Sequence, residues 1–348
     1  NKMIVYGGQN SEDVAEYDPS TNRWGFLPDS PIPVDGHSSV AINGKMYSYG
    51  GRSVDFNTLN SINQYDPSTD TWTELRPDGS AGMKRHSAAV IGNKLYVYGG
   101  ANDFVNQMNS LFVYDLISNS WARLNDGPVD ISGHTAVAIN GKMYIYGGVS
   151  GFIVNLLYEY DPATDNWTRL TDGPNSNHGF SIVGINGKLL VYGGRSDFEV
   201  NTLHEYDPAT DTWIQLANGP VSIRNHSAAI VKDKMYIYGG WDGSRELNTL
   251  YEYDPETNSW TQLTRGPIFV NAHKATDIDD KMYIYGGRGF NTLYEYDTTA
   301  DTWTQLTDGP FPEGSLEHTV NSINNKMVMY GGREGSINDP RNNLYLVE

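Results

Sequence analysis

The sequence contains no cysteine among its 348 residues. This absence excludes disulfides, thiolate metal ligands and cysteine nucleophiles. Basic residues are also scarce: 24 Lys and Arg stand against 42 Asp and Glu, which gives a formal net charge of -18. Binding to nucleic acid or to an anionic membrane surface needs clustered positive charge, so neither partner is expected. No apolar run approaches the ~18 residues of a spanning helix, so no membrane insertion is expected.

Familiar catalytic and metal-binding motifs are missing as well. There is no GxSxG elbow, no HExxH and no P-loop, and the DIDD at 277–280 lacks the spacing of an EF-hand. We therefore expect no catalytic residue, no metal site and no cofactor. Whether the chain is an enzyme stays open, with a non-catalytic role preferred.

What the sequence does contain is a repeat. The heptapeptide KMYIYGG begins at Lys142, Lys234 and Lys281, and near copies begin at residues 2, 45, 94, 188 and 326. Successive Gly pairs stand about 46 residues apart on average, which is the period of a repeat architecture. Each unit contains four strand-like segments, as at 134–140, 142–148, 156–161 and 166–170, and no helical period interrupts them.

The segments are separated by turn residues. Asn-Gly or a related pair joins the first two, which predicts a tight hairpin with positive φ. Asp-Pro sequences join the third and fourth and predict a second hairpin. KMYIYGG has Met, Tyr, Ile and Tyr in succession, so both faces of that strand must be covered, whereas YEYD and TWTQL alternate and should lie nearer solvent. A sheet of this kind needs a neighbour on each face, as a propeller blade does.

These residues resemble the kelch repeat. A Gly pair ends the second strand, Tyr-Asp ends the third, and a Trp follows six residues after that Asp in seven units. The resemblance covers essentially the whole chain and implies an all-β propeller of four-stranded antiparallel blades. It predicts one domain over 1–348, with units starting near 37, 86, 134, 178, 226, 273 and 318 and partial units at 1–36 and 318–348. Kelch propellers are mainly binding modules, with a minority of enzymes.

The two ends of the chain decide the number of blades. The N-terminal unit lacks a first strand, and the C-terminal unit lacks a fourth. Counting motifs predicts eight blades, because strands left outside any blade would expose sheet edges. Seven blades with end-strand closure is the alternative. Unpaired end strands also suggest self-association as a further function.

Antiparallel strands place the loops after the Gly pairs and the segments before the first strands on one face. These loops vary in length and sequence, so recognition should lie there. Several arginines and one tryptophan belong to this face: Arg52, Arg85, Arg195, Arg224, Trp241, Arg288 and Arg333. The resemblance to kelch adaptor proteins implies that such arginines hold acidic peptides. Alternatively, they pair with nearby carboxylates such as Asp55 or Asp197.

A second pattern on the same face is aromatic. Five phenylalanines fall three to five residues after a Gly pair: Phe56, Phe104, Phe152, Phe198 and Phe290. They either cap their own blades or form an aromatic crown for a protein or a sugar.

Histidine recurs at one position of the repeat, eight residues before the hairpin Lys. Phe180 occupies that position in one unit. Equivalent positions of a ring are spread around it and do not converge on one ion, so a structural role is expected.

The leading hypothesis is a non-catalytic module that presents its variable-loop face to an acidic protein motif or a glycan. A carbohydrate-active enzyme similar to sialic acid mutarotases is the alternative. Kelch copper oxidases use a cysteine-linked tyrosine and are excluded. We expect a soluble chain, with a secreted or cell-surface location preferred.

Overall fold

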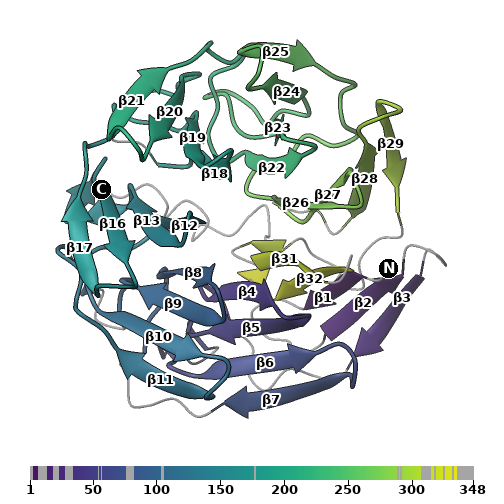
Figure 1. The fold of residues 1–348 in the computed structure, drawn as a ribbon. Helices are drawn as coiled ribbons and strands as arrows, with labels where there is room; N and C mark the ends of the chain where they lie inside the picture. Colours follow the sequence, from purple (N-terminus) through teal and green to yellow (C-terminus); the bar gives the residue numbers. More distant parts are fainter. Residues whose placement is uncertain are drawn as a thin grey trace.

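The computed structural model shows β-strands arranged in a ring (Figure 1). It describes residues 3–6, 14–18, 23–27, 34–53, 55, 57–75, 82–102, 106–175, 178–287, 290, 292–306, 315–316, 319–323, 326–330 and 333–334. Within these ranges no helix is long and apolar enough to cross a membrane.

Six antiparallel sheets of four strands follow one another around the ring, and we number them as blades 1 to 6. Blade 1 is β4 (Ser38–Ile42), β5 (Lys45–Tyr49), β6 (Ile62–Asp66) and β7 (Thr71–Leu75). Blade 2 is β8 (Ser87–Ile91), β9 (Lys94–Tyr98), β10 (Leu111–Asp115) and β11 (Ser120–Arg123). Blade 3 is β12 (Thr135–Ile139), β13 (Lys142–Tyr146), β16 (Leu157–Asp161) and β17 (Asn166–Arg169).

The second half of the ring has the same plan. Blade 4 is β18 (Ser181–Ile185), β19 (Lys188–Tyr192), β20 (Leu203–Asp207) and β21 (Thr212–Gln215). Blade 5 is β22 (Ser227–Val231), β23 (Lys234–Tyr238), β24 (Leu250–Asp254) and β25 (Ser259–Gln262). Blade 6 is β26 (Lys274–Ile278), β27 (Lys281–Tyr285), β28 (Leu293–Asp297) and β29 (Thr302–Gln305). Two short pairs complete the described elements: β14 (Val149–Ser150) with β15 (Phe152–Ile153), and β30 (Ser315–Leu316) with β33 (Arg333–Glu334).

A five-stranded sheet made from both ends of the chain closes the ring, and we call it the closing sheet. Its strands are, in order, β31 (Thr319–Ile323), β32 (Lys326–Tyr330), β1 (Met3–Tyr6), β2 (Val14–Asp18) and β3 (Arg23–Leu27). β1 runs parallel to β32, with Ile4 opposite Val328. β31 contacts both β26 and β4, so the inner strands form an unbroken circle.

The predicted number of blades is therefore wrong. Among the described residues there are six four-stranded blades, and neither eight nor seven such blades are found. The incomplete units at the two ends share one sheet, in which β1 covers the edge of β32 and leaves no open strand edge between them. The expected C-terminal strand at 342–348 lies outside the described residues.

The hairpins form as the turn residues predict. In blade 3, Asn140 and Gly141 have φ of 51° and 77°, the two positive values that a primed two-residue turn needs. At the other hairpin, the Asp161 carboxylate accepts a hydrogen bond from Ala163 N at 2.8 Å, and Tyr160 Oη donates to Asp165 Oδ1 at 2.8 Å. Side-chain acceptors thus hold the turn backbone in place.

The second strands are buried as predicted, with four of five residues buried in β13. The third strands are more buried than their alternating pattern suggested. Both tyrosines of β16 are buried, Tyr160 completely. Blades 2 to 5 each pack one face on the blade before and the other on the blade after. The fourth strand is the most exposed one, as in β17, where three of four residues are exposed.

The core consists of the spaces between blades. Between blades 3 and 4, Tyr146 packs with Val191, Tyr206 and Trp213, and the rings of Tyr146 and Trp213 lie 5.5 Å apart. Trp213 Nε1 also donates to Thr171 O of the preceding blade at 2.9 Å. The same tryptophan bond recurs at Trp167, Trp260 and Trp303. The repeated Trp is therefore both an apolar contact and a hydrogen-bonded link between blades.

The repeated histidines of blades 2, 3, 5 and 6 are buried in these same interfaces. His226 Nε2 and Ser181 Oγ of the preceding blade are 2.8 Å apart, and the His226 ring stands edge-on to Tyr192 at 5.4 Å. Similar Ser–His bonds join Ser38 to His86 and Ser227 to His273. Phe180 takes the histidine position in blade 4 and packs against Tyr146. The position is thus occupied by rings that pack between blades.

The Gly pair permits this close packing. A Cβ on Gly193 would lie 2.7 Å from Ile223 O and 3.0 Å from His226 Cε1 of the next blade, and the residue has φ of +67°. A side chain at this position would collide with the neighbouring blade, so the repeat requires glycine here.

Candidate functional site

The variable-loop face carries an inner rim built from pairs of residues. In blades 1 to 5, the residue after the Gly pair forms a β-bridge with the residue two places before the histidine position. The pairs are Asp35–Arg52, Lys84–Ala101, Ser132–Val149, His178–Arg195 and Arg224–Trp241. The rim therefore brings together two segments that lie about 17 residues apart in each unit.

A belt of backbone hydrogen bonds ties the rim from blade to blade. Arg85 N donates to Gly36 O at 2.8 Å, and Gly133 N donates to Arg85 O at 2.8 Å. On the other side of the ring, Asn225 N donates to Gly179 O at 2.7 Å. The residues of the belt have positive φ, and Arg85 is exposed there. Side chains of the rim thus start from a backbone that is fixed by the neighbouring blades.

Four side chains gather on the rim between blades 4 and 5, and we call them the Arg–Glu cluster: His178, Arg195, Glu199 and Arg224. Glu199 Oε1 lies 3.2 Å from Arg224 Nε and 4.0 Å from Arg195 Nη1. The side chains of Glu199 and Arg224 are 10% and 18% exposed, while that of Arg195 is 32% exposed. A Cβ on Gly243 would lie 2.8 Å from Glu199 Oε2, so this glycine leaves room for the carboxylate.

The cluster carries a surplus of positive charge. Burial lowers the pKa of His178, and the charges of Arg224 and Arg195 lower it further, so the imidazole is neutral near pH 7. Burial and the charge of Arg195 also lower the pKa of Arg224. One carboxylate thus faces two guanidinium groups. Arg224 Nε and Glu199 Oε1 are close but misaligned, and neither makes a hydrogen bond with the described residues.

The other predicted arginines have different surroundings. Arg52 makes a two-pronged ion pair with Asp35 at 3.1 and 2.7 Å, and Asp35 is only 2% exposed. The carboxylate paired with Arg52 thus belongs to the segment just before blade 1, a residue that sequence reasoning did not single out. Trp241 is half-buried beside Arg224 through their backbone bridge. Two further candidates give no side-chain geometry: Arg288 lies outside the described residues, and Arg333 belongs to β33 with only its backbone described.

The predicted phenylalanines divide into two kinds. Phe152 and Phe198 are 73% and 78% exposed, while Phe290 is partly buried against the core between blades 5 and 6. Phe152 stands in a β14–β15 hairpin that Gly151 N anchors on Gln107 Oε1 at 3.0 Å. Phe56 and Phe104 lie outside the described residues.

Sequence reasoning missed two members of this face. Phe269 is 52% exposed in the connection from blade 5 to blade 6. The equivalent residues in other units are Asp130 and Ser222, so comparing the units would have singled it out. Glu199 stands four residues after Arg195, a spacing that also signals an ion pair. Among the described residues, no three His, Cys, Asp or Glu side chains gather in a way that would hold a metal ion.

Comparison with known proteins gives the repeat its family. The model of the KLHDC2/KLHL20/DRC7 Kelch-repeats domain matches residues 1–128, 80–218 and 133–332. The chain belongs to the kelch-repeat family. It is 40% identical to an F-box/kelch-repeat protein of Arabidopsis thaliana over 63 residues, and this alignment covers 18% of this chain and 17% of that protein. It is 33% identical to Kelch-like protein 40 of Mus musculus over 84 residues, and this alignment covers 22% of this chain and 14% of the relative. The matches thus span less than a fifth of either relative.

The fold of this kelch chain resembles a solved propeller. The structure of YjhT aligns with a TM-score of 0.61 at 19% identity and covers 81% of this chain and 99% of that one. At this identity the likeness concerns the fold alone.

Proposed function

We propose that this kelch propeller is an interaction module whose variable-loop face binds an acidic segment of a protein partner. Arg195 carries the proposal: it stands on the rim, a third exposed, and its charged neighbour Glu199 is 4.0 Å away and shared with Arg224. A carboxylate from a partner would supply the second negative charge that the two guanidinium groups lack. Bidentate pairing of Arg with carboxylates gives such contacts both strength and direction.

Two exposed aromatic side chains on the same face also support a protein partner. Phe152 and Phe198 belong to the loops of blades 3 and 4, and each exposes about three quarters of its surface. Exposed aromatic residues beside arginine are the usual composition of interface hot spots. The chain is strongly acidic overall, at -18, so an acidic partner is steered only by local positive charge such as this cluster.

The test is fluorescence anisotropy with fluorescein-labelled dodecapeptides that contain a Glu-Glu pair flanked by Phe or Leu. Arg195→Ala should weaken the binding of a selected peptide about 10- to 100-fold, as expected for the loss of one charge-assisted contact. Arg169→Ala is the matched control, because Arg169 is 59% exposed and pairs with Asp172 on the outer strand. Unchanged binding by both Arg195→Ala and Arg224→Ala would refute the proposal.

A carbohydrate-active role is the second candidate, and one observation favours it. The cluster combines a neutral imidazole, His178, with the Glu199 carboxylate beside two arginines, which are groups that hold an acidic sugar and move its protons. Proton NMR of acidic sugar anomers, with wild-type protein and with Glu199→Gln, tests this role. Anomer exchange that is no faster with protein than without it would eliminate this candidate.

A further inference from the structure

The closing sheet is assembled from two incomplete repeat units. β31 and β32 correspond to the first and second strands of one unit, whereas β1, β2 and β3 correspond to the second, third and fourth strands of another. Two second strands therefore lie side by side in the middle of this sheet (Figure 1). In blade 3, by contrast, the second strand β13 lies between a first strand and a third strand, and it is antiparallel to both.

The pairing of β1 with β32 differs from that inside a blade. Within the described part of the chain one register pair joins these two strands, Ile4 with Val328, whereas four join β13 and β16. The β1–β32 pairing is parallel, which is slightly less stable per residue than antiparallel pairing. β1 occupies the edge at which β32 would receive a third strand, and β32 occupies the edge at which β1 would receive a first strand.

Blade 1 presents a polar pair to the closing sheet. In other blades a register pair of the second and third strands is apolar or aromatic and packs toward the preceding blade. These pairs are Val97–Phe112, Ile145–Tyr158, Ile237–Tyr251 and Ile284–Tyr294. The corresponding pair in blade 1 is Ser48–Asn63, and each of the two residues is 2% exposed. The sheet before blade 1 is the closing sheet, whose β31 contacts β4.

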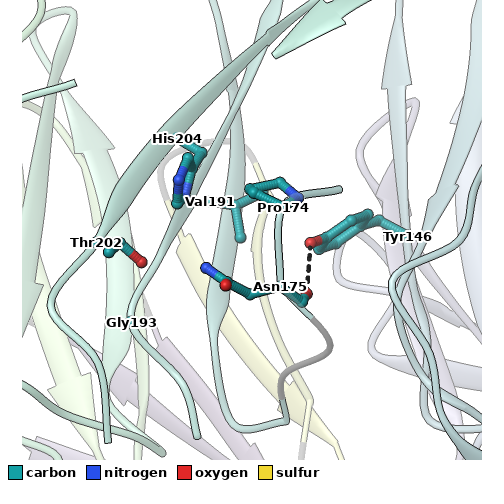
Figure 2. A pocket seen from close by; sticks show the side chains of 7 residues that line it. All are labelled: Tyr146, Pro174, Asn175, Val191, Gly193, Thr202 and His204. Carbon is teal, nitrogen blue, oxygen red and sulfur yellow. Dashed lines mark hydrogen bonds between the residues drawn. The ribbon is translucent and has the colours of Figure 1, made fainter. Parts of the chain in front are cut away.

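The amide of Asn63 is not fully satisfied in this contact. Its Oδ1 is buried and accepts no hydrogen bond within the residues that the structure describes. Blade 4 also has a polar residue at this place, His204, but there Tyr146 Oη donates to Asn175 O at 3.3 Å beside it, and the space left has room for about one water molecule (Figure 2). An unpaired buried amide oxygen makes the contact of blade 1 with the closing sheet less favourable than an apolar pair would.

The connection between the closing sheet and blade 1 is short and rich in proline. β3 ends at Leu27, and the six residues 28–33 that follow read PDSPIP. Proline restricts φ and stiffens a connecting segment. Short hinges of restricted conformation favour the exchange of an element between two copies of a chain.

We propose that the closing sheet is an exchange interface for a second copy of this chain. Each copy supplies β1, β2 and β3 to the β32 edge of the other, so both rings close through the pairing that closes a single ring. The polar pair of blade 1 makes the sheet easier to open. The resulting two-fold dimer carries two variable-loop faces and binds a partner with repeated motifs more tightly than one face does. The exchange does not depend on what the Arg–Glu cluster binds.

Because the chain has no cysteine of its own, two single-cysteine variants of the 348-residue chain test the exchange directly: Ile4→Cys and Val328→Cys, one of them with a size tag. The folded proteins are mixed at up to about 1 mM, which is the effective concentration of a flexibly linked segment, and are oxidised mildly. Exchange places the two cysteines opposite each other, so a disulfide between tagged and untagged chains should accumulate with time and with protein concentration. Ala88→Cys mixed with Val97→Cys is the matched control, because these register partners belong to one blade and should not link two copies.

Asn63→Leu tests the polar pair, since it removes the unpaired oxygen with little change of shape. In this background the disulfide-linked dimer should form about tenfold more slowly. Thr249→Val is its control and should leave the rate unchanged: Thr249 is also buried, with an Oγ1 that makes no hydrogen bond among the described residues, but it directly precedes β24 in blade 5. No linked dimer at any concentration, as much of it in the Ala88 and Val97 mixture, or an unchanged rate for Asn63→Leu would overturn the proposal.

Discussion

Replacing one buried histidine should make the stability of this propeller less sensitive to acid. Burial in the interface lowers the pKa of the His134 imidazole from 6.5 to about 3. The ring stands edge-on to Tyr98 with centroids 5.3 Å apart at 68°, the same geometry that Phe180 adopts against Tyr146. His134 makes no hydrogen bond among the described residues, so His134→Phe removes a titrating group from a site whose shape already accommodates phenylalanine.

Proton linkage sets the sign and the size of the change in folding stability with pH. The pKa is lower in the folded state, so the unfolded chain binds more protons below pH 6.5 and stability falls as the pH falls toward 3. At pH 5 the wild type should have lost about 2 kcal/mol through this one ring, compared with about 0.2 kcal/mol at pH 7. His86, His226 and His273 add losses of similar size, because burial lowers the pKa of His86 to about 4 and of the other two to about 3.

Urea unfolding followed by tryptophan fluorescence at pH 5, 6 and 7 measures the effect. The free energy of unfolding of His134→Phe should gain about 2 kcal/mol relative to wild type between pH 7 and pH 5, whatever the offset at pH 7. Carboxylates titrate alike in both proteins and cancel in the difference. Phe180→His should make the free energy of unfolding fall more steeply than that of the wild type between pH 7 and pH 5, because it adds a titrating ring. The reasoning would be refuted if the difference in free energy of unfolding between His134→Phe and wild type changed by less than about 0.5 kcal/mol from pH 7 to pH 5.

Two further substitutions test the packing and the rim. Gly193→Ala should destabilise the ring by about 2 kcal/mol or more, because its Cβ would lie 2.7 Å from Ile223 O of the next blade at positive φ. Thermal unfolding measures this loss, and a midpoint equal to that of the wild type would contradict it. Arg52→Ala should lower the free energy of unfolding by about 3 kcal/mol, because it leaves the buried Asp35 carboxylate without this ion pair. In urea unfolding, the double variant with Asp35→Ala should recover much of this loss. A double variant as unstable as the single variant would exclude the ion pair as the cause.

The blade itself was predictable because its signals are local. Asn-Gly turns, the apolar second strand and the Gly pair act within a few residues, and each adopts the predicted conformation. The third strand was harder to read. Its alternating Tyr and Glu pattern suggested exposure, but the neighbouring blade covers the tyrosines, and a single unit carries no information on that contact.

The candidate site was predicted only in part. Arg195 and Arg224 were found from their positions after and before repeated motifs, and the structure brings them together. Arg52 shares the same motif, yet a buried ion pair with Asp35 occupies it. Which arginine has a spare charge depends on carboxylates of its own and the neighbouring blade, and these lie up to 25 residues away along the chain, as between Glu199 and Arg224.

The sequence by itself determined the repeat, the all-β class and the face on which variation gathers, because hairpins and strand burial follow from residues close together in the chain. Only the tertiary structure decided how the ring closes and where polar groups remain unsatisfied. The two ends meet in one sheet through a β1–β32 pairing that joins residues more than 300 positions apart. The Arg–Glu cluster likewise forms between blades. Its geometry depends on how neighbouring units pack, which the spacing within any one unit does not specify.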